Sequence, residues 1–272
     1  MELNLTYEDI VKTLREKSYI NVPFSVDSER IIEAMDAFFR FLEEPSEIKE
    51  HIDFTIAPKH RRGDVGFKRR DPSDHIYNDS KEFFHFHPAV FERYSEFIAE
   101  NPVLNDFLNK ALPIWEAAYD TVSTVLHVFE SGFPNVHNEV FATKDIHLLL
   151  RFLKYNWQSS GKYLAKPHCD AGSFTLAIAE SCEGLRIGSH PGNLQTVVHG
   201  ANQALFMLAS NFRTVLNTDQ FSAGWHDVIQ VDDLLVGQPF ARWALVAFIE
   251  AADVEALPRS ETHKWYAAAI NT

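Results

Sequence analysis

A histidine and an aspartate two residues apart, His168 and Asp170, are the pair with the clearest potential for chemistry. If this segment is extended, side chains at positions i and i+2 point to the same face, so the imidazole and the carboxylate would converge. Two histidines and one carboxylate form the facial triad that binds non-haem Fe(II) and leaves coordination positions open. The pair therefore predicts a metal site if a second histidine reaches it. The alternative is a surface turn with two polar residues.

The second histidine must come from well downstream, and four residues could supply it: His190, His199, His226 and His263. His190 and His199 lie close to turns, and His263 lies in the C-terminal tail. His226 begins an apolar segment and is far enough from His168 to allow several intervening strands. We therefore expect His226 to be the third ligand.

An arginine, Arg242, opens the apolar segment that runs to Phe248. If its side chain points inward, it needs an anionic partner, because an unpaired buried charge is costly. A planar guanidinium can bind a carboxylate through two parallel hydrogen bonds, as a dicarboxylic oxoacid would require. The alternative is an arginine exposed at a strand end.

Three other groups of reactive residues have less specific patterns. His85 and His87 lack a carboxylate partner at useful spacing, so we expect them to be structural or to line a pocket. The polar segment 55–80 carries a cluster of basic residues and is predicted to be a solvated loop, with a lid that docks an anionic substrate as the alternative. Cys169 lies between two predicted ligands and should point to the opposite face as a small buried hydrophobe.

The elements that must position these residues differ between the two halves of the chain. Apolar periodicity predicts helices over 5–16, 28–43, 88–99 and 103–130, with a strand over 19–24. Thr6 with Asp9, and Ser28, are placed to cap the first two helices, and Pro113 should kink or divide the last one. From about residue 146, short apolar runs separated by turn residues predict eight strands. These runs are 147–155, 173–179, 184–188, 194–198, 204–209, 212–217, 226–231 and 242–249.

This pattern predicts an α+β fold with a double-stranded β-helix (jelly-roll) core and a helical N-terminal lobe. We expect residues 1–145 to form the helical support region, with a short strand and a lid loop. Residues 146–272 are expected to form the jelly-roll core, and both regions should belong to one structural unit. Such a barrel has an open mouth where ligands from strand ends can converge.

Composition narrows the classes of partner. The net charge of −13 argues against non-specific binding of nucleic acid or of an anionic membrane surface. Two cysteines cannot form a disulfide framework, the N-terminus lacks the pattern of a signal peptide, and no apolar run is long enough to span a bilayer. These features predict a soluble cytoplasmic protein.

The order His168-x-Asp170, His226, Arg242 resembles the Fe(II)- and 2-oxoglutarate-dependent oxygenases, and more narrowly their isopenicillin N synthase-like branch. Other segments share the likeness: Leu150–Tyr155 before the first ligand, Gly184–Ile187 after it, and His226-Asp227-Val228 around the last histidine. The likeness spans most of the chain. It is specific as a set, although each piece is short.

The resemblance implies roles for individual residues. His168, Asp170 and His226 would hold Fe(II), Arg242 would pair with the distal carboxylate of 2-oxoglutarate, and Tyr155 would help to hold that cosubstrate. Two positions depart from the family pattern. Ala244 replaces the serine of Arg-x-Ser, and Leu153 replaces an asparagine two residues before the tyrosine. The spacing from histidine to arginine is also longer than usual, which implies a longer hairpin near 232–239.

The implied activity is that of a dioxygenase that uses O2 and 2-oxoglutarate and releases succinate and CO2. It would oxidise, and in the simplest case hydroxylate, a C–H bond of a small molecule such as an amino-acid derivative or secondary metabolite. Substrate contacts are expected from 60–87, with Phe84 and Phe86, and from the strand near Arg151 and Phe152. The alternatives are an oxoacid-independent Fe(II) oxidase or synthase of the same fold, a non-catalytic metal-binding barrel, and a zinc hydrolase. The last lacks a suitable glutamate near the ligands and any His-Glu-x-x-His motif.

Overall fold

The computed structural model describes residues 5–56, 64–70, 80–142, 147–157, 163–230 and 239–251. Its helices are α1 (Tyr7–Lys17), α2 (Ser28–Leu42), α3 (Ser46–Lys49), α4 (Ala89–Arg93), α5 (Ser95–Glu100), α6 (Pro102–Phe129), α7 (Val136–Val140) and α8 (Phe212–Leu216). Its strands are β1 (Tyr19–Pro23), β2 (Asp53–Thr55), β3 (Asp64–Arg70), β4 (Lys81–Phe86), β5 (Leu148–Tyr155), β6 (Tyr163–His168), β7 (Phe174–Glu180), β8 (Leu185–Gly188), β9 (Gln195–Thr196), β10 (Gln203–Leu208), β11 (Trp225–Ile229) and β12 (Arg242–Ile249).

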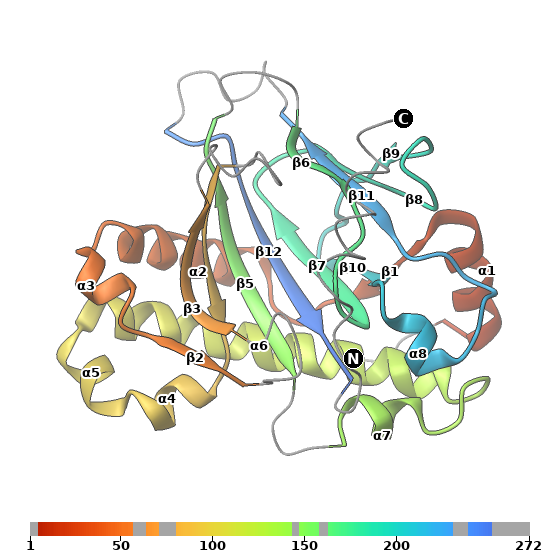
Figure 1. Cartoon of the computed structure of the whole chain (residues 1–272), viewed down its shortest axis with the longest axis horizontal. Coiled ribbons are helices and arrows are strands. Elements are labelled where there is room, and N and C mark those ends of the chain that lie inside the picture. The colour runs from red at the N-terminus through yellow and green to blue at the C-terminus, as the bar shows by residue number, and fades with distance from the viewer. Residues whose placement is uncertain are drawn as a thin grey trace.

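The described strands form two antiparallel sheets, which together with the helices give the expected α+β class. The larger sheet has the order β1-β10-β7-β12-β5-β4-β3-β2, and the smaller one has the order β6-β11-β8-β9. In Figure 1 the smaller sheet gathers at the upper right, while α6 runs horizontally across the lower half of the picture. Four strands of the larger sheet, β1 to β4, come from before residue 146, so the N-terminal region supplies part of the sheet as well as helices.

One hydrophobic cluster joins the helices to the larger sheet. Phe38 and Phe41 of α2 contact Phe107 of α6, and Phe107 also packs edge-to-face on Phe152 of β5. Trp115 of α6 donates a hydrogen bond of 2.8 Å from Nε1 to the backbone carbonyl of Leu148, which fixes the helix against the start of β5. These buried rings stabilise the support region by removing a large apolar area from water.

A second hydrophobic cluster lies between the two sheets, with members from both of them. Along β5, Leu153 and Tyr155 belong to this cluster, whereas Leu150 and Phe152 belong to the helix-facing one. Alternate residues of a strand point to opposite faces, so Leu153 and Tyr155 face the smaller sheet. The functional residues on β5 and its neighbours are placed by this alternation.

The structure confirms several local predictions and corrects others. Thr6 and Asp9 form a reciprocal capping box at α1, as expected. The cap of α2 is Asp27 and not Ser28, because the Asp27 carboxylate accepts from the backbone amide of Arg30. The predicted helix over 88–99 is two helices that meet at Tyr94, and α6 continues through Pro113 without being divided.

Four segments that matter for the sheets differ from the prediction. Residues 212–217 were expected to be a strand, but α8 occupies them, because Phe212, Val215 and Leu216 bury apolar groups at helical spacing. Strand β6 was missed and pairs with β11. Part of the polar 55–80 segment is strand β3, paired with β4, while its residues 57–63 and 71–79 lie outside the described residues. The predicted strand over 194–198 is only Gln195–Thr196.

Among the residues that the structure describes, no helix combines the length and the apolar character needed to cross a bilayer.

Candidate metal centre and its cavity

The three predicted metal ligands come together where β6 and β11 pair. His168 ends β6 and lies directly opposite His226 in the antiparallel register, and Asp170 follows His168 by two residues. Opposite residues in such a pair have side chains on the same face at short distance. One ligand atom from each of the three residues can be chosen so that all lie within 4.8 Å of one another. The sequence prediction for this set therefore agrees with the geometry.

Both histidines present the same nitrogen to the common point. His168 Nδ1 lies 2.7 Å from the carbonyl oxygen of Lys166, and His226 Nδ1 lies 3.0 Å from that of Gly224. A carbonyl oxygen only accepts, so each Nδ1 carries a proton and each Nε2 is the nitrogen that can bind a metal. The Nε2 atoms lie 3.9 Å and 3.5 Å from the two carboxylate oxygens of Asp170. A metal ligand histidine is oriented in this way when its other nitrogen is held by a carbonyl.

The electrostatics keep the donors in the form that binds a cation. Burial, together with the neighbouring His226, lowers the pKa of His168 to about 3, so its imidazole is neutral at ordinary pH. The Asp170 carboxylate accepts a hydrogen bond of 3.0 Å from Thr175 Oγ1 on β7, which fixes its orientation. Cys169 is buried and lies outside the ligand group, as expected, and burial raises the pKa of its thiol well above the usual value.

The triad lines a cavity between the two sheets, part of which is open to solvent. Alternate residues of β12 face it, namely Arg242, Ala244, Val246 and Phe248. Apolar side chains from β5, β7, β8, β10 and β11 share the remaining wall with a similar number of polar and charged ones. A cavity that combines apolar walls with convergent polar groups is the usual form of a small-molecule site.

Arg242 is almost fully buried in this cavity, with 1% of its surface exposed. Its Nη2 pairs with the Glu180 carboxylate, while Nε and Nη1 are buried without a hydrogen-bond partner among the described residues. Burial lowers the pKa of Arg242 to about 10, which leaves the guanidinium charged at neutral pH. Tyr155 lies opposite Arg242 in the β5–β12 register and lines the same cavity. Buried donors left unsatisfied cost free energy, so this guanidinium is suited to receive an anion.

Glu180 was missed in the sequence and is the acid closest to Arg242. It lies opposite Ala244 in the β7–β12 register and faces the same cavity. Its other carboxylate oxygen lies 3.3 Å from His199 Nδ1, and His199 Nε2 donates to the carbonyl of Ala177. His199 therefore belongs to this second polar cluster and not to the metal ligands. The only sequence signal was an acid that ends an otherwise apolar strand.

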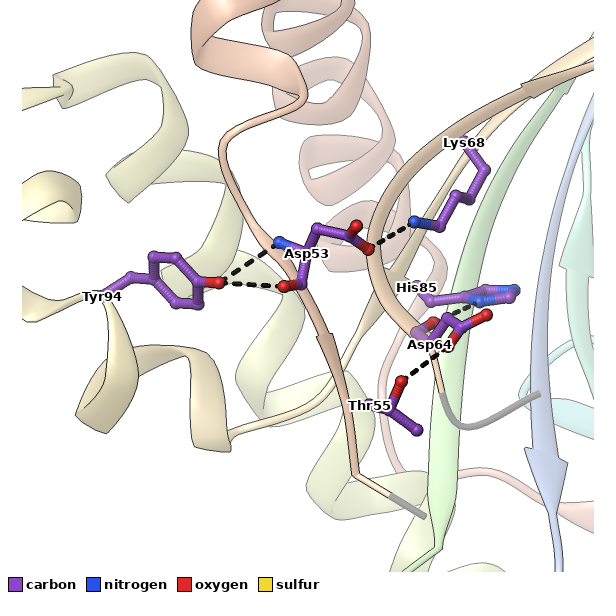
Figure 2. A network of polar contacts seen from close by, with 6 residues as sticks. All are labelled: Asp53, Thr55, Asp64, Lys68, His85 and Tyr94. Atoms are coloured by element: carbon purple, nitrogen blue, oxygen red, sulfur yellow. Dashed lines mark hydrogen bonds and ion pairs between the residues drawn. The ribbon is translucent and has the colours of Figure 1, made fainter. Parts of the chain in front are cut away.

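Of the residues predicted to contact substrate, some line the cavity and others do not. Phe84, Phe86 and Phe152 are fully buried in the helix-facing core and do not line the cavity, so the expectation that they contact substrate is wrong. Arg151, on the opposite face of β5, does line it. Of the predicted basic lid, Lys68 forms an ion pair with Asp53 at 2.6 Å, as Figure 2 shows, while Lys59, Arg61 and Arg62 lie outside the described residues. The predicted hairpin at 232–239 lies almost wholly outside them as well.

The two histidines upstream have structural roles, as expected. His87 Nδ1 accepts from the backbone amide of Ala89 at the start of α4. His85 Nδ1 lies 2.8 Å from the Asp64 carbonyl oxygen, and its Nε2 accepts from Arg151 Nε at 2.7 Å.

Comparison with solved structures shows the fold. A full-length Neurospora crassa protein solved with α-ketoglutarate and thymine shares 17% identity, with a TM-score of 0.68 over 97% of this chain and 91% of that one. A Caulobacter crescentus protein described as belonging to the 2OG-Fe(II) oxygenase family shares 16% identity, with a TM-score of 0.67 over 97% of this chain and 93% of that one. The dioxygenase for auxin oxidation 1 from Arabidopsis thaliana, solved with 2-oxoglutarate, shares 15% identity, with a TM-score of 0.63 over 95% of this chain and 94% of that one. No protein-family model and no curated protein matches the chain. The chain thus has the fold of Fe(II)- and 2-oxoglutarate-dependent oxygenases.

Proposed function

We propose that this protein is a non-haem Fe(II)- and 2-oxoglutarate-dependent dioxygenase that oxidises a C–H bond of a small molecule, with release of succinate and CO2. The observation that carries the proposal is that one buried cavity holds both the His168, Asp170 and His226 group and the Arg242 guanidinium. A cation site and an anion site in the same cavity are what a metal-chelating oxoacid requires. The shared fold with proteins solved with 2-oxoglutarate supports the same activity.

We also infer that the two sheets form the double-stranded β-helix predicted from the sequence. The larger sheet and the smaller sheet face each other across a shared apolar cluster, and the triad residues of β6 and β11 line the cavity between them. This is the arrangement in which ligands from strand ends converge at the mouth of a jelly roll.

The donor set fits Fe(II). Two imidazoles and one carboxylate offer three ligand atoms at one point, and three donors leave positions for a cosubstrate and O2. A structural zinc site is normally closed by four protein ligands, so a triad with open positions favours a reactive centre over a non-catalytic barrel. Thr175 and the two backbone carbonyls that hold the ligands are the outer contacts that orient such a centre.

When bound, Fe(II) with 2-oxoglutarate and O2 supplies the oxidising power, and the oxoacid is converted to succinate and CO2. Arg242 would bind the distal carboxylate through Nε and Nη1, the donors that find no hydrogen-bond partner among the described residues. Tyr155 lies beside it and is placed to contact the same ligand. The apolar walls contributed by Leu153, Ala244 and Val246 exclude water from the bound cosubstrate and substrate.

Two departures from the family pattern now have a structural setting. Ala244 and Leu153 both line the cavity, so the missing serine hydroxyl and asparagine amide would have faced the bound oxoacid. Recognition of the distal carboxylate therefore depends on Arg242 and on the residues around it, which include Glu180.

The experiment that tests the proposal is an anaerobic titration of the Fe(II)-loaded protein with 2-oxoglutarate, followed by visible absorbance. Chelation of Fe(II) by the oxoacid should give a weak charge-transfer band. We expect His226→Ala to abolish the band and Arg242→Ala to shift the titration to higher 2-oxoglutarate concentration. As a control, Arg40→Ala removes a half-exposed arginine of α2 that pairs with Asp106 and does not line the cavity.

The outcomes separate the competing functions. If iron binds without a band, the oxoacid assignment is wrong and the oxoacid-independent oxidase or synthase replaces it. If iron does not bind to the folded protein, the triad assignment itself is wrong.

A further inference from the structure

Glu180 and His199 border two cavities of the protein. One is the metal cavity, and the other is lined by the start of α2, by the chain just before it and by residues 199–203 ahead of β10. The two side chains are largely buried, with 8% and 11% of their surfaces exposed. A proton can therefore reach this pair from the second cavity without passing the metal ligands.

The atoms of the two side chains that face each other are both hydrogen-bond acceptors. His199 Nε2 donates to the carbonyl oxygen of Ala177 at 3.0 Å, so the single proton of the neutral imidazole is on Nε2. Its Nδ1 then carries a lone pair and lies 3.3 Å from a carboxylate oxygen of Glu180. That Nδ1 is buried and has no hydrogen-bond partner among the described residues. One added proton on Nδ1 would turn this contact between two acceptors into a charge-assisted hydrogen bond.

In the free protein this proton is absent at neutral pH. Burial lowers the pKa of His199 and outweighs the opposite effect of its hydrogen bond to Ala177, so the imidazole is neutral. The other carboxylate oxygen of Glu180 pairs with Arg242 Nη2. The cluster of Glu180, His199 and Arg242 therefore carries one negative and one positive charge, which balance.

Few other groups act on the charge of His199. Among the described residues that line the second cavity, Glu180 and His199 are the only titratable ones. Among the described residues, Glu180 is also the only acid within ion-pair distance of the His199 ring. The other titratable or charged groups of the metal cavity come from β4, β5, β6, the turn after β6, and β11, and they are Lys81, Arg151, Tyr155, His168, Asp170 and His226.

Binding of 2-oxoglutarate changes this balance. Arg242 Nε and Nη1 are the buried donors available to the distal carboxylate. When that carboxylate binds, one guanidinium faces two carboxylates, and the cluster has one negative charge in excess. An uncompensated buried charge is unfavourable, and a nearby negative charge favours the protonated imidazole. A proton on His199 Nδ1 would restore neutrality.

We propose that 2-oxoglutarate binds together with one proton, which His199 takes up on Nδ1 and donates in a hydrogen bond to Glu180. The inference rests on the proposed function, because it concerns the cosubstrate of the same centre. The proton comes from solvent, and no bond of the cosubstrate changes. His199 is thus a positioning residue that acts through Glu180 and Arg242. Protonating a neutral imidazole costs free energy, so Glu180 still opposes the cosubstrate at neutral pH.

The test is calorimetric titration of 2-oxoglutarate into the oxygen-free, Mn(II)-loaded protein in PIPES, HEPES and ACES buffers, whose enthalpies of ionisation differ. The dependence of the measured heat on that enthalpy gives the number of protons taken up. We expect about 0.5 to 1 proton per bound 2-oxoglutarate at about pH 7. Because the complex holds the proton more tightly than the free protein does, affinity should fall roughly threefold to tenfold from about pH 6.5 to 7.5.

Two variants locate the proton. His199→Gln removes the group that titrates, and Glu180→Gln removes the carboxylate that holds the proton, so each should reduce the uptake to less than about 0.2 proton and make affinity nearly independent of pH. A purely structural role of His199 would instead weaken binding equally at every pH. The matched control is His190→Gln, because His190 is exposed, accepts from the backbone amide of Gly192 and lines neither cavity. It should leave the uptake unchanged.

The inference is overturned if the wild-type protein binds 2-oxoglutarate without taking up a proton between about pH 6.5 and 8, or if uptake persists in either variant. The wild-type measurement is decisive even where a variant fails to fold. Failure of the proposed function has a different signature, because the wild-type protein would then not bind 2-oxoglutarate at all, and both proposals would fall together.

Discussion

Replacing Glu180 with glutamine is expected to tighten the binding of 2-oxoglutarate by about tenfold or more. In the wild-type protein the Glu180 carboxylate pairs with Arg242 Nη2, so an incoming carboxylate must share the guanidinium with an existing negative charge. Glutamine keeps an acceptor oxygen for Nη2 and removes the charge. The variant lacks the attraction between Glu180 and Arg242 both before and after 2-oxoglutarate binds, so this loss does not change the affinity. The affinities of wild type and variant therefore differ mainly by the repulsion between the Glu180 carboxylate and the bound carboxylate of 2-oxoglutarate.

The size of the effect follows from the geometry of one guanidinium. Two carboxylates on adjacent edges of the fork are about 6 Å apart, and at an effective dielectric constant of about 20 their repulsion is roughly 3 kcal/mol. Relaxation of the side chains will reduce this value. A gain of about 1.4 kcal/mol corresponds to tenfold tighter binding, which is the smallest effect that the reasoning allows.

The assay is a titration of 2-oxoglutarate into the Mn(II)-loaded protein by calorimetry, with Glu82→Gln as the matched control. Glu82 also loses an ion pair, with Lys154, but it does not line the cavity. Without cosubstrate, Glu180→Gln should lower the free energy of unfolding by about 3 kcal/mol, because the buried Arg242 loses its counter-charge. Saturating 2-oxoglutarate should recover most of that loss. Unchanged or weaker binding would refute the reasoning and would mean that Glu180 serves to orient Arg242.

Three further predictions concern the metal ligands and their surroundings. His226→Ala should reduce Fe(II) affinity by about 100-fold or more without unfolding the protein, as measured by metal content after dialysis and by circular dichroism; retained iron at wild-type affinity would exclude this histidine as a ligand. Asp227 is fully buried and accepts from Arg186 Nε at 2.8 Å. Arg186→Met removes this counter-charge and should therefore lower the free energy of unfolding, measured by urea denaturation, by about 3 kcal/mol. A loss below about 1 kcal/mol would contradict this prediction. The metal-free protein should lose stability as pH falls from about 6.5 toward 3, because the unfolded chain binds a proton at His168 that the folded state binds only near its lowered pKa of about 3. The free energy of unfolding should change less steeply with pH in His168→Gln. An equal pH dependence in both proteins would show that other groups cause it.

The sequence alone determined the parts of the site that depend on short spacing. His168 and Asp170 share a face because strand side chains alternate, and this holds wherever the strand lies in the fold. The support helices could be predicted for the same reason, since the apolar periodicity of α2 and α6 is local. The choice of His226 needed an argument about topology as well, and the β6–β11 register agrees with it.

Only the tertiary structure decided which side chains enter the cavity. Glu180 reaches Arg242 because β7 carries an extra residue relative to β12, between the pairs Ala177–Val246 and Ala179–Leu245. Such a bulge reverses which residues of a strand face inward, and no pattern in the segment predicts it.

The same non-local dependence explains the other errors. Phe84 and Phe152 were expected to contact substrate, but their strands present them to the helices and present Arg151 to the cavity. The α8 segment is apolar and short, which favours a strand by local preference alone, yet packing of Phe212, Val215 and Leu216 requires a helix. Local spacing fixes which residues can act together, whereas strand pairing and packing between sheets fix which of them meet, because those contacts join residues far apart in the chain.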